Sequence, residues 1–105
     1  MKILIAEDSA MGRLLLQRTV EGLGHECLVA DDGVMAWELF LREGADVVIS
    51  DWLMPGMEGP ELCRRLRGAA SPYAYFVFLT VLRDKQHALQ GVRAGADDYL
   101  TKPLD

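Results

Sequence analysis

Five polar side chains stand directly behind apolar stretches of this chain. Glu7 and Asp8 follow Ile-Leu-Ile-Ala, and Asp51 follows Val-Val-Ile-Ser. Thr80 ends Phe-Val-Phe-Leu, and Lys102 follows Asp-Tyr-Leu-Thr. If these stretches are parallel strands, their carboxyl ends share one edge of a sheet, where open α/β sheets bind ligands. The sequence therefore predicts that three carboxylates, a hydroxyl and an ammonium meet at that edge.

This combination of groups favours phosphoryl chemistry. Three carboxylates within a few ångströms cannot all ionise without compensation, and a hard divalent cation removes the conflict. Carboxylate oxygens with several retained waters suit Mg²⁺ better than Ca²⁺, which needs more ligands. Lys102 adds a compact donor for phosphate oxygens, and Thr80 adds a hydroxyl. We expect Asp51 to be the nucleophile of an aspartyl-phosphate site, with Glu7 and Asp8 holding the metal.

The elements that must position these groups alternate along the chain. Apolar runs at 2–6, 26–30, 46–50, 75–80 and 97–101 predict strands, and segments with helical spacing lie at 9–23, 33–43, 60–67 and 84–94. Ser9 and Asp84 are suitable N-caps, and Gly24, Gly44 and Gly95 are suitable stops. Strict alternation predicts an α/β fold: a flavodoxin-like, doubly wound parallel sheet of five strands in the order 2-1-3-4-5.

Each predicted helix carries an apolar face. The inward positions are Leu16, Val20 and Leu23 in the first helix, Val34, Trp37 and Leu41 beside Ala36 and Phe40 in the second, and Leu62, Cys63 and Leu66 in the third. After the fifth strand the sequence ends at Asp105. We expect it to lack a fifth helix, so that only the first helix covers one sheet face and an apolar patch there favours self-association.

Composition excludes several classes of function. The chain has 105 residues, enough for one domain, and a net charge of −5 that argues against a nucleic-acid surface. No apolar run approaches the roughly 20 residues of a membrane span, and the start lacks the pattern of a signal peptide. Cys27 and Cys63 are expected to be free, mostly buried thiols. We therefore expect a cytoplasmic protein with no membrane partner.

Four motifs together resemble the receiver domain of two-component response regulators, over the whole chain from 1 to 105. They are Ile-Ala-Glu-Asp-Ser at 5–9, Asp-Trp-Leu-Met-Pro-Gly-Met-Glu-Gly at 51–59, Phe-Leu-Thr at 78–80 and Ala-Gly-Ala-Asp-Asp-Tyr-Leu-Thr-Lys-Pro at 94–103. Each motif alone is weak, but their order and separations are specific. The resemblance implies a CheY-like domain that ends before its last helix.

The resemblance also implies a role for each matching residue. It assigns phosphorylation to Asp51, Mg²⁺ binding to Glu7 and Asp8 with the backbone carbonyl of Leu53, phosphate binding to Lys102, switching to Thr80 and Tyr99, and a cis bond to Lys102–Pro103. The partners implied are a histidine kinase or phosphotransfer protein and an output domain or protein that the sequence does not name, and a homodimer stays open. No enzymatic activity beyond the domain's own phosphorylation and dephosphorylation is expected.

Three other functions compete with this interpretation. A pseudo-receiver would keep the fold as an interaction module without phosphorylation, but it has no need of the complete acidic set and Lys102. An aspartyl phosphatase commonly needs a second acid two residues after its nucleophile, where this chain has Leu53. A flavin carrier is disfavoured because the first loop, 7–11, is acidic where a cofactor phosphate would lie.

The remaining residues receive structural interpretations. Leu53 and Leu82 lie two positions after Asp51 and Thr80, where the resemblance to receivers implies that they flank the phosphoryl group. Because both are apolar, we expect them to exclude water and prolong the life of a phosphoryl group. Trp52 is expected to be partly exposed beside the site. Trp37 and Phe40 are expected in the core, His25 and His87 are structural or solvated, and Arg64, Arg65 and Arg67 form a solvated helix face.

Overall fold

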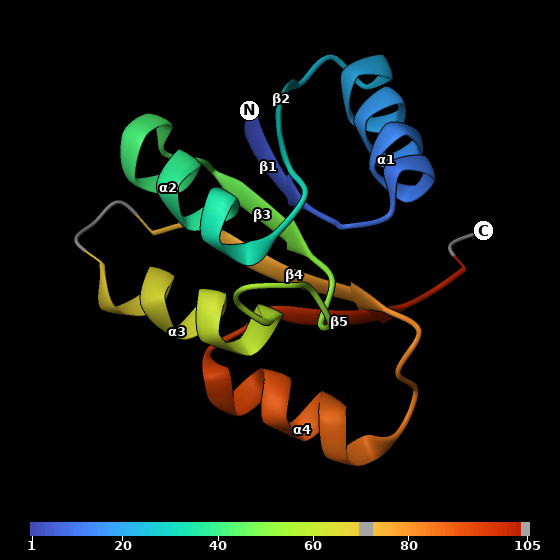
Figure 1. The fold of residues 1–105 in the computed structure, drawn as a ribbon, viewed down its shortest axis with the longest axis vertical. Helices are drawn as coiled ribbons and strands as arrows, with labels where there is room; N and C mark the ends of the chain where they lie inside the picture. Colours follow the sequence, from blue (N-terminus) through green and yellow to red (C-terminus); the bar gives the residue numbers. More distant parts are fainter. Residues whose placement is uncertain (70–72, 104–105) are drawn as a thin grey trace.

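The sheet has the predicted order and is wholly parallel. The computed structural model describes residues 1–69 and 73–103, and its five strands are arranged β2-β1-β3-β4-β5 (Figure 1). The strands are β1 (Lys2–Ala6), β2 (Glu26–Ala30), β3 (Val47–Ser50), β4 (Tyr75–Thr80) and β5 (Asp98–Thr101). The register sets Ala6 opposite Ser50 and Thr80 opposite Thr101, so the strand ends that precede the polar residues lie at one edge.

Four helices connect the strands, close to their predicted bounds. They are α1 (Ala10–Gly22), α2 (Gly33–Glu43), α3 (Gly59–Gly68) and α4 (Lys85–Ala94). Ser9 and Asp84 cap α1 and α4 as predicted, since their side chains accept hydrogen bonds from backbone N–H groups one turn on. Gly95 ends α4 at φ 107°, a left-handed conformation that favours glycine.

The two faces of the sheet carry unequal layers. Helices α2, α3 and α4 pack side by side on one face, and α1 lies on the other (Figure 1). Side chains alternate along β1: Leu4 and Ala6 join the large core under α2–α4, whereas Ile3 and Ile5 join a smaller cluster with Val20 of α1. In the described part of the chain, α1 is the one helix on its face, as the sequence predicts.

The predicted helix faces are correct for α3 and partly wrong for α1 and α2. Leu62, Cys63 and Leu66 are buried. Leu23 is 70% exposed because it lies past the last turn of α1. Leu41 is 61% exposed, since α2 turns its smallest side chain, that of Ala36, to the core.

The predicted core positions in α2 are likewise only partly correct. Val34, expected to point inward, is exposed. Trp37 and Phe40 are half-buried against the core and stack on each other. The fully buried residues of α2 are thus the small ones, Gly33 and Ala36, and the larger side chains are only partly covered.

Both cysteines are free, as predicted. Burial raises the pKa of the Cys63 thiol to about 11, and burial with the nearby Glu21 carboxylate raises the pKa of Cys27 to about 11. Both are therefore protonated near neutral pH. Among the described residues, no helix combines the length and apolar character needed to cross a membrane.

Arg67 corrects the expectation of a solvated arginine face on α3. Its guanidinium donates to the carbonyls of Gly95 (2.8 Å) and Ala74 (2.7 Å) and to the Asp97 carboxylate (2.8 Å). Arg64 and Arg65 do lie at the surface, where both pair with Glu61. The sequence could not reveal this difference, because the partners of Arg67 lie in other elements.

Candidate functional site

Three carboxylates converge at the carboxyl edge of the sheet. Glu7 and Asp8 follow β1, Asp51 follows β3, and one oxygen from each lies within 4.8 Å of the others. The parallel pairing of β1 with β3 produces this geometry, because Ala6 lies opposite Ser50 at the strand ends. The sequence-predicted acidic set is therefore assembled by the fold.

Glu7 lies between β1 and α1, and its carboxylate is closely packed. Its side chain is nearly fully buried, and the Ser9 N–H donates to its Oε2 at 3.2 Å. A Cβ on Gly12 would lie 3.3 Å from Oε1, so the absence of a side chain there leaves room for the carboxylate. Asp8 is exposed, which leaves its oxygens accessible from solvent.

Lys102 lies between two of these carboxylates. Its ammonium contacts Glu7 Oε1 and lies 3.1 Å from Asp51 Oδ2. Burial opposes its charge, but hydrogen bonds to Glu7 and Asp51 outweigh that cost, so the pKa of Lys102 is raised. The Lys102–Pro103 peptide bond is cis, which confirms the prediction.

The cluster retains an excess of negative charge. Three carboxylates and one ammonium leave two negative charges uncompensated. The backbone N–H of Trp52 donates to Asp51 Oδ1 at 2.6 Å, which fixes the orientation of that carboxylate. Hard carboxylate oxygens with open solvent access on the Asp8 side fit a small divalent cation that keeps several waters.

Thr80 and Tyr99 meet at the loop after β4. Thr80 is buried, and its Oγ1 accepts a hydrogen bond from the Leu82 N–H at 3.2 Å. The Tyr99 hydroxyl donates to the Leu82 carbonyl at 2.6 Å. Burial, followed by the charges of Asp84 and Asp51, raises the pKa of Tyr99. The predicted switch residues are thus linked through one residue's backbone.

The two apolar neighbours of the site differ in exposure. Leu53 is 52% exposed, whereas Leu82 packs against the large core. Leu53 is therefore open to solvent, and Leu82 is partly buried.

Trp52 is buried, contrary to the sequence prediction. It is 5% exposed and packs against Phe78, with ring centroids 4.9 Å apart, and edge-on to His87 and Tyr99. The loop after Asp51 folds back, and the Gly59 N–H donates to the Trp52 carbonyl. This return of the chain is a tertiary feature that local sequence does not reveal.

Sequence reasoning missed two arginines near the site. Arg13 of α1 donates from Nη1 to the carbonyls of Glu7 (2.9 Å) and Asp8 (3.3 Å). Arg83, in the loop after β4, donates from Nη2 to the carbonyl of Lys102 at 2.6 Å. Both bind backbone oxygens of predicted site residues, and such contacts leave no pattern in the sequence.

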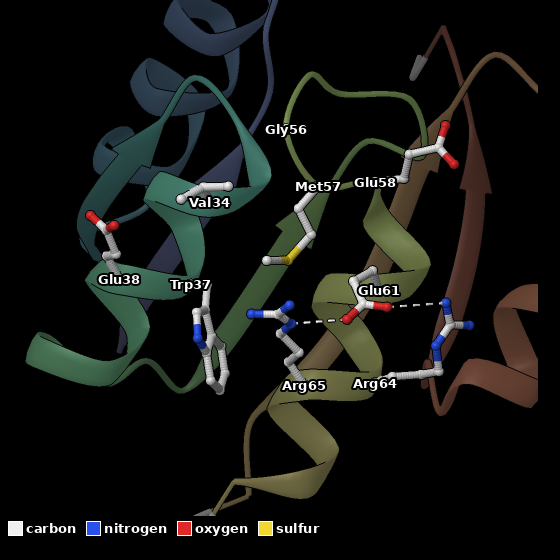
Figure 2. A pocket seen from close by; sticks show the side chains of 9 residues that line it. All are labelled: Val34, Trp37, Glu38, Gly56, Met57, Glu58, Glu61, Arg64 and Arg65. Carbon is white, nitrogen blue, oxygen red and sulfur yellow. Dashed lines mark hydrogen bonds and ion pairs between the residues drawn. The ribbon is translucent and has the colours of Figure 1, made fainter.

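A separate groove lies between α2 and α3, and its lining includes none of Glu7, Asp8 and Asp51. Figure 2 shows Trp37 and Met57 in it, with Glu61 placed between Arg64 and Arg65. The two arginines share this exposed carboxylate, so their charges are already engaged on their own helix. Exposed pairs of this kind are worth little energetically, and we assign the groove no function.

Comparisons with known proteins point to one family. The family model described as "Response regulator receiver domain" matches residues 3–105. The Pseudomonas aeruginosa phosphate regulon transcriptional regulatory protein PhoB is 36% identical over 103 residues, which cover 97% of this chain and 45% of that protein. A Campylobacter jejuni chemotaxis protein CheY homolog is 36% identical over 108 residues, covering 99% of this chain and 82% of that one.

Solved structures show the same similarity. Chemotaxis protein CheY4 of Vibrio cholerae superposes with a TM-score of 0.92 at 30% identity, covering 99% of this chain and 88% of that one. The BeF₃-activated receiver domain of Klebsiella pneumoniae RstA also gives 0.92 at 30% identity, covering 100% and 88%. The chain spans about half the length of PhoB and most of the length of the CheY homolog.

Proposed function

The chain belongs to the response regulator receiver domain family, and we propose that it is a signalling switch controlled by phosphorylation of Asp51. The observation that carries this proposal is the convergence of Glu7, Asp8 and Asp51 beside the ammonium of Lys102. A structural role alone would not require like charges to be held together at such a cost.

The proposed reaction is transfer of a phosphoryl group to the Asp51 carboxylate. An oxygen of Asp51 attacks the phosphorus, a new O–P bond forms, and the bond to the donor nitrogen or acyl oxygen breaks with its electron pair. The leaving group is the imidazole of a phosphohistidine or, with acetyl phosphate, acetate. The Trp52 N–H holds Oδ1 of Asp51 in a fixed orientation for this attack.

Charge compensation is divided among the surrounding residues. Glu7 and Asp8 would hold Mg²⁺ with Asp51 and the carbonyl of Leu53, and the metal would supply charge neutralisation at the equatorial oxygens. Lys102 would bind one of those oxygens, and Thr80 would donate its hydroxyl to another. For Lys102 this requires a short movement of its ammonium from Glu7 toward the new group.

Switching would proceed through the loop after β4. When Thr80 turns toward a phosphoryl group, its Oγ1 leaves the N–H of Leu82, whose carbonyl holds the Tyr99 hydroxyl. Thr80 and Tyr99 would then rearrange together and alter the surface of α4 and β5. Phosphorylation would act by shifting a two-state equilibrium through this differential contact.

The proposed donor is a histidine kinase or a phosphotransfer protein of a two-component system. PhoB is named as a transcriptional regulatory protein and is longer than this chain. An output domain or a separate output protein would receive the signal here, and dimerisation after phosphorylation is compatible with either. Direct nucleic-acid binding by these 105 residues is not proposed, because their net charge is −5.

A pseudo-receiver that signals without phosphorylation is the second candidate. The intact acidic set and Lys102 favour the phosphorylated switch, since a binding module needs neither. The phosphorylated switch and the pseudo-receiver can be distinguished by one simple measurement, the mass of the intact protein.

Intact mass after incubation with acetyl phosphate, with and without Mg²⁺, tests the proposal. We expect a Mg²⁺-dependent gain of one phosphoryl group in the wild type and none in Asp51→Asn. No gain in the wild type, while the V. cholerae CheY4 protein gains one in parallel, would contradict the proposal and favour the pseudo-receiver.

A further inference from the structure

We infer that Arg83 is a positioning residue that holds Lys102 in place for phosphoryl transfer. Its Nη2 donates to the backbone carbonyl of Lys102 at 2.6 Å, a charge-assisted hydrogen bond between the loop after β4 and the end of β5. The inference rests on the proposed function, because it concerns how the site's lysine is oriented.

Lys102 needs support beyond the sheet. The register of β4 with β5 ends at Thr80 and Thr101, one residue before Lys102. The Lys102 N–H donates to the Thr80 carbonyl at 2.8 Å, and Arg83 binds the Lys102 carbonyl. The two bonds fix the peptide units on both sides of the lysine Cα. Without the bond from Arg83, the peptide group on the C-terminal side of Lys102 is no longer connected to the loop after β4.

The Lys102 side chain is long and flexible, so the position of its ammonium depends on how firmly its backbone is held. A lysine stem has four carbons and loses much rotamer freedom when its ammonium is held at one point. The Lys102 side chain is about a quarter exposed, whereas that of Glu7 is almost fully buried. Packing therefore orients the glutamate fully and the lysine only in part. A fixed backbone reduces the number of conformations open to the Lys102 side chain and so favours the one that places its ammonium beside Asp51.

The same loop carries the proposed switch. Leu82, next to Arg83, bonds both Thr80 Oγ1 and the Tyr99 hydroxyl. A movement of this loop would therefore reach Lys102 through Arg83. Arg83 links the charge that binds the phosphoryl group to the residues that respond to it.

The test compares Arg83→Ala, Arg83→Lys and Arg42→Ala with the wild type. Arg42 is the matched control, an exposed arginine at the C-terminal end of α2 that pairs with the adjacent Glu43. Three quantities are measured: the phosphorylation rate with acetyl phosphate at saturating Mg²⁺, the Mg²⁺ dissociation constant by amide chemical shifts, and the melting temperature.

We expect Arg83→Ala to slow phosphorylation about tenfold, which is about 1.4 kcal/mol in the barrier, and to leave Mg²⁺ affinity nearly unchanged. Arg83→Lys keeps one donor and should recover most of the rate, and Arg42→Ala should match the wild type. A rate for Arg83→Ala within about twofold of wild type would overturn the inference, taking twofold as smaller than one lost hydrogen bond.

Equal losses of rate, Mg²⁺ affinity and melting temperature, without rescue by lysine, would also overturn it, since they indicate general damage. If the wild type gains no phosphoryl group at all, the proposed function fails and the inference falls with it. If the wild type is phosphorylated and Arg83→Ala is equally fast, only the inference fails.

Discussion

Two ionic clusters lie at opposite edges of the same sheet, and they are built on different principles. The amino-edge cluster comprises Arg67, Tyr73 and Asp97 near the starts of β4 and β5. Asp97 accepts hydrogen bonds from the Tyr73 hydroxyl, from Arg67 Nη2 at 2.8 Å and from the Phe76 N–H at 2.8 Å. Arg67 also lies over the Tyr73 ring, 4.2 Å from its centroid. One positive charge meets one negative charge.

The carboxyl-edge cluster comprises Glu7, Asp8, Asp51 and Lys102. It holds three negative charges against one positive charge, at distances where like charges repel. A cluster that serves stability alone is expected to balance its charges and satisfy its hydrogen bonds, as the amino-edge cluster does. The imbalance at the carboxyl edge therefore supports the proposal that a ligand binds there.

The largest predicted contrast is in the rate of phosphorylation. In the proposed reaction, Lys102→Ala would remove a charge that stabilises the transferring group, and loss of one such donor costs about 10²- to 10³-fold in rate. Arg67→Ala should leave the rate per folded molecule unchanged. The rates are measured with acetyl phosphate and Mg²⁺ by intact mass, with folded fractions from circular dichroism. A comparable slowing in both variants would erase the distinction between the clusters.

The second contrast is in stability. Asp97→Ala leaves the Arg67 guanidinium, about four-fifths buried, without its carboxylate, and we expect a loss of about 3 kcal/mol. Asp97→Asn keeps acceptor geometry and should lose less. Urea unfolding followed by circular dichroism measures both. A loss below about 0.5 kcal/mol for Asp97→Ala, the scale of an ordinary surface substitution, would show that the amino-edge cluster contributes little.

The third prediction concerns the cation. If Mg²⁺ binds the folded state at the proposed site, Mg²⁺ at about 100 times its dissociation constant should stabilise the wild type by about 2.7 kcal/mol. Asp8→Asn should reduce this gain, and Asp97→Asn should retain it in full. Thermal unfolding with and without MgCl₂ makes the comparison, with NaCl adjusted to equal ionic strength. An equal Mg²⁺ gain in Asp8→Asn would place the cation elsewhere.

The fourth prediction uses pH at the amino edge. Burial opposes the charge of Asp97, but hydrogen bonds from Tyr73 and Phe76 and the charge of Arg67 outweigh it, so the pKa of Asp97 is lowered. A lowered pKa means that its contribution is present above the ordinary carboxyl value of about 4 and is lost as pH falls through the folded-state value. Stability should therefore fall more steeply below pH ~4 in the wild type than in Asp97→Asn. Urea unfolding across this pH range measures it, and parallel curves would argue against this pair.

The smallest expected effect is on phosphoryl lifetime. Leu53 is half-exposed two residues after Asp51, and an amide there would be expected to orient an attacking water. Leu53→Asn should shorten the half-life of the phosphorylated domain a few-fold, on the order of 1 kcal/mol. Decay of the added mass after removal of acetyl phosphate measures it, with Leu41→Asn as an exposed control on α2. Equal half-lives would defeat the idea that apolar neighbours exclude water.

The carboxyl edge is largely predictable from sequence, and the amino edge is not. Glu7, Asp51 and Lys102 each follow a strand directly, so the rule that parallel strands share an edge is enough to bring them together. Arg67 and Asp97 carry no such signal, because Arg67 lies at a helix end and its partners belong to two loops. Its contacts depend on how α3 packs, which periodicity does not specify.

The same distinction explains the error at Trp52. Its position after Asp51 suggested an exposed loop, but the loop folds back and seats the ring against Phe78 and His87. The prediction of the buried helix face was wrong in part of α2, where the small Ala36 faces the core and Leu41 is exposed. Local pattern predicts elements and strand ends, whereas the detailed packing between elements needs the tertiary structure.

The most direct test of the charge imbalance is the unfolding free energy of Asp51→Asn against the wild type without divalent cations. Because the substitution removes one of three crowded negative charges, the unfolding free energy of the variant should equal that of the wild type or exceed it by up to about 1 kcal/mol. Mg²⁺ should then stabilise the wild type more than the variant. If Asp51→Asn is instead destabilised as strongly as Asp97→Ala, then Asp51 is a structural partner of Lys102, and the carboxyl edge is not an incomplete site.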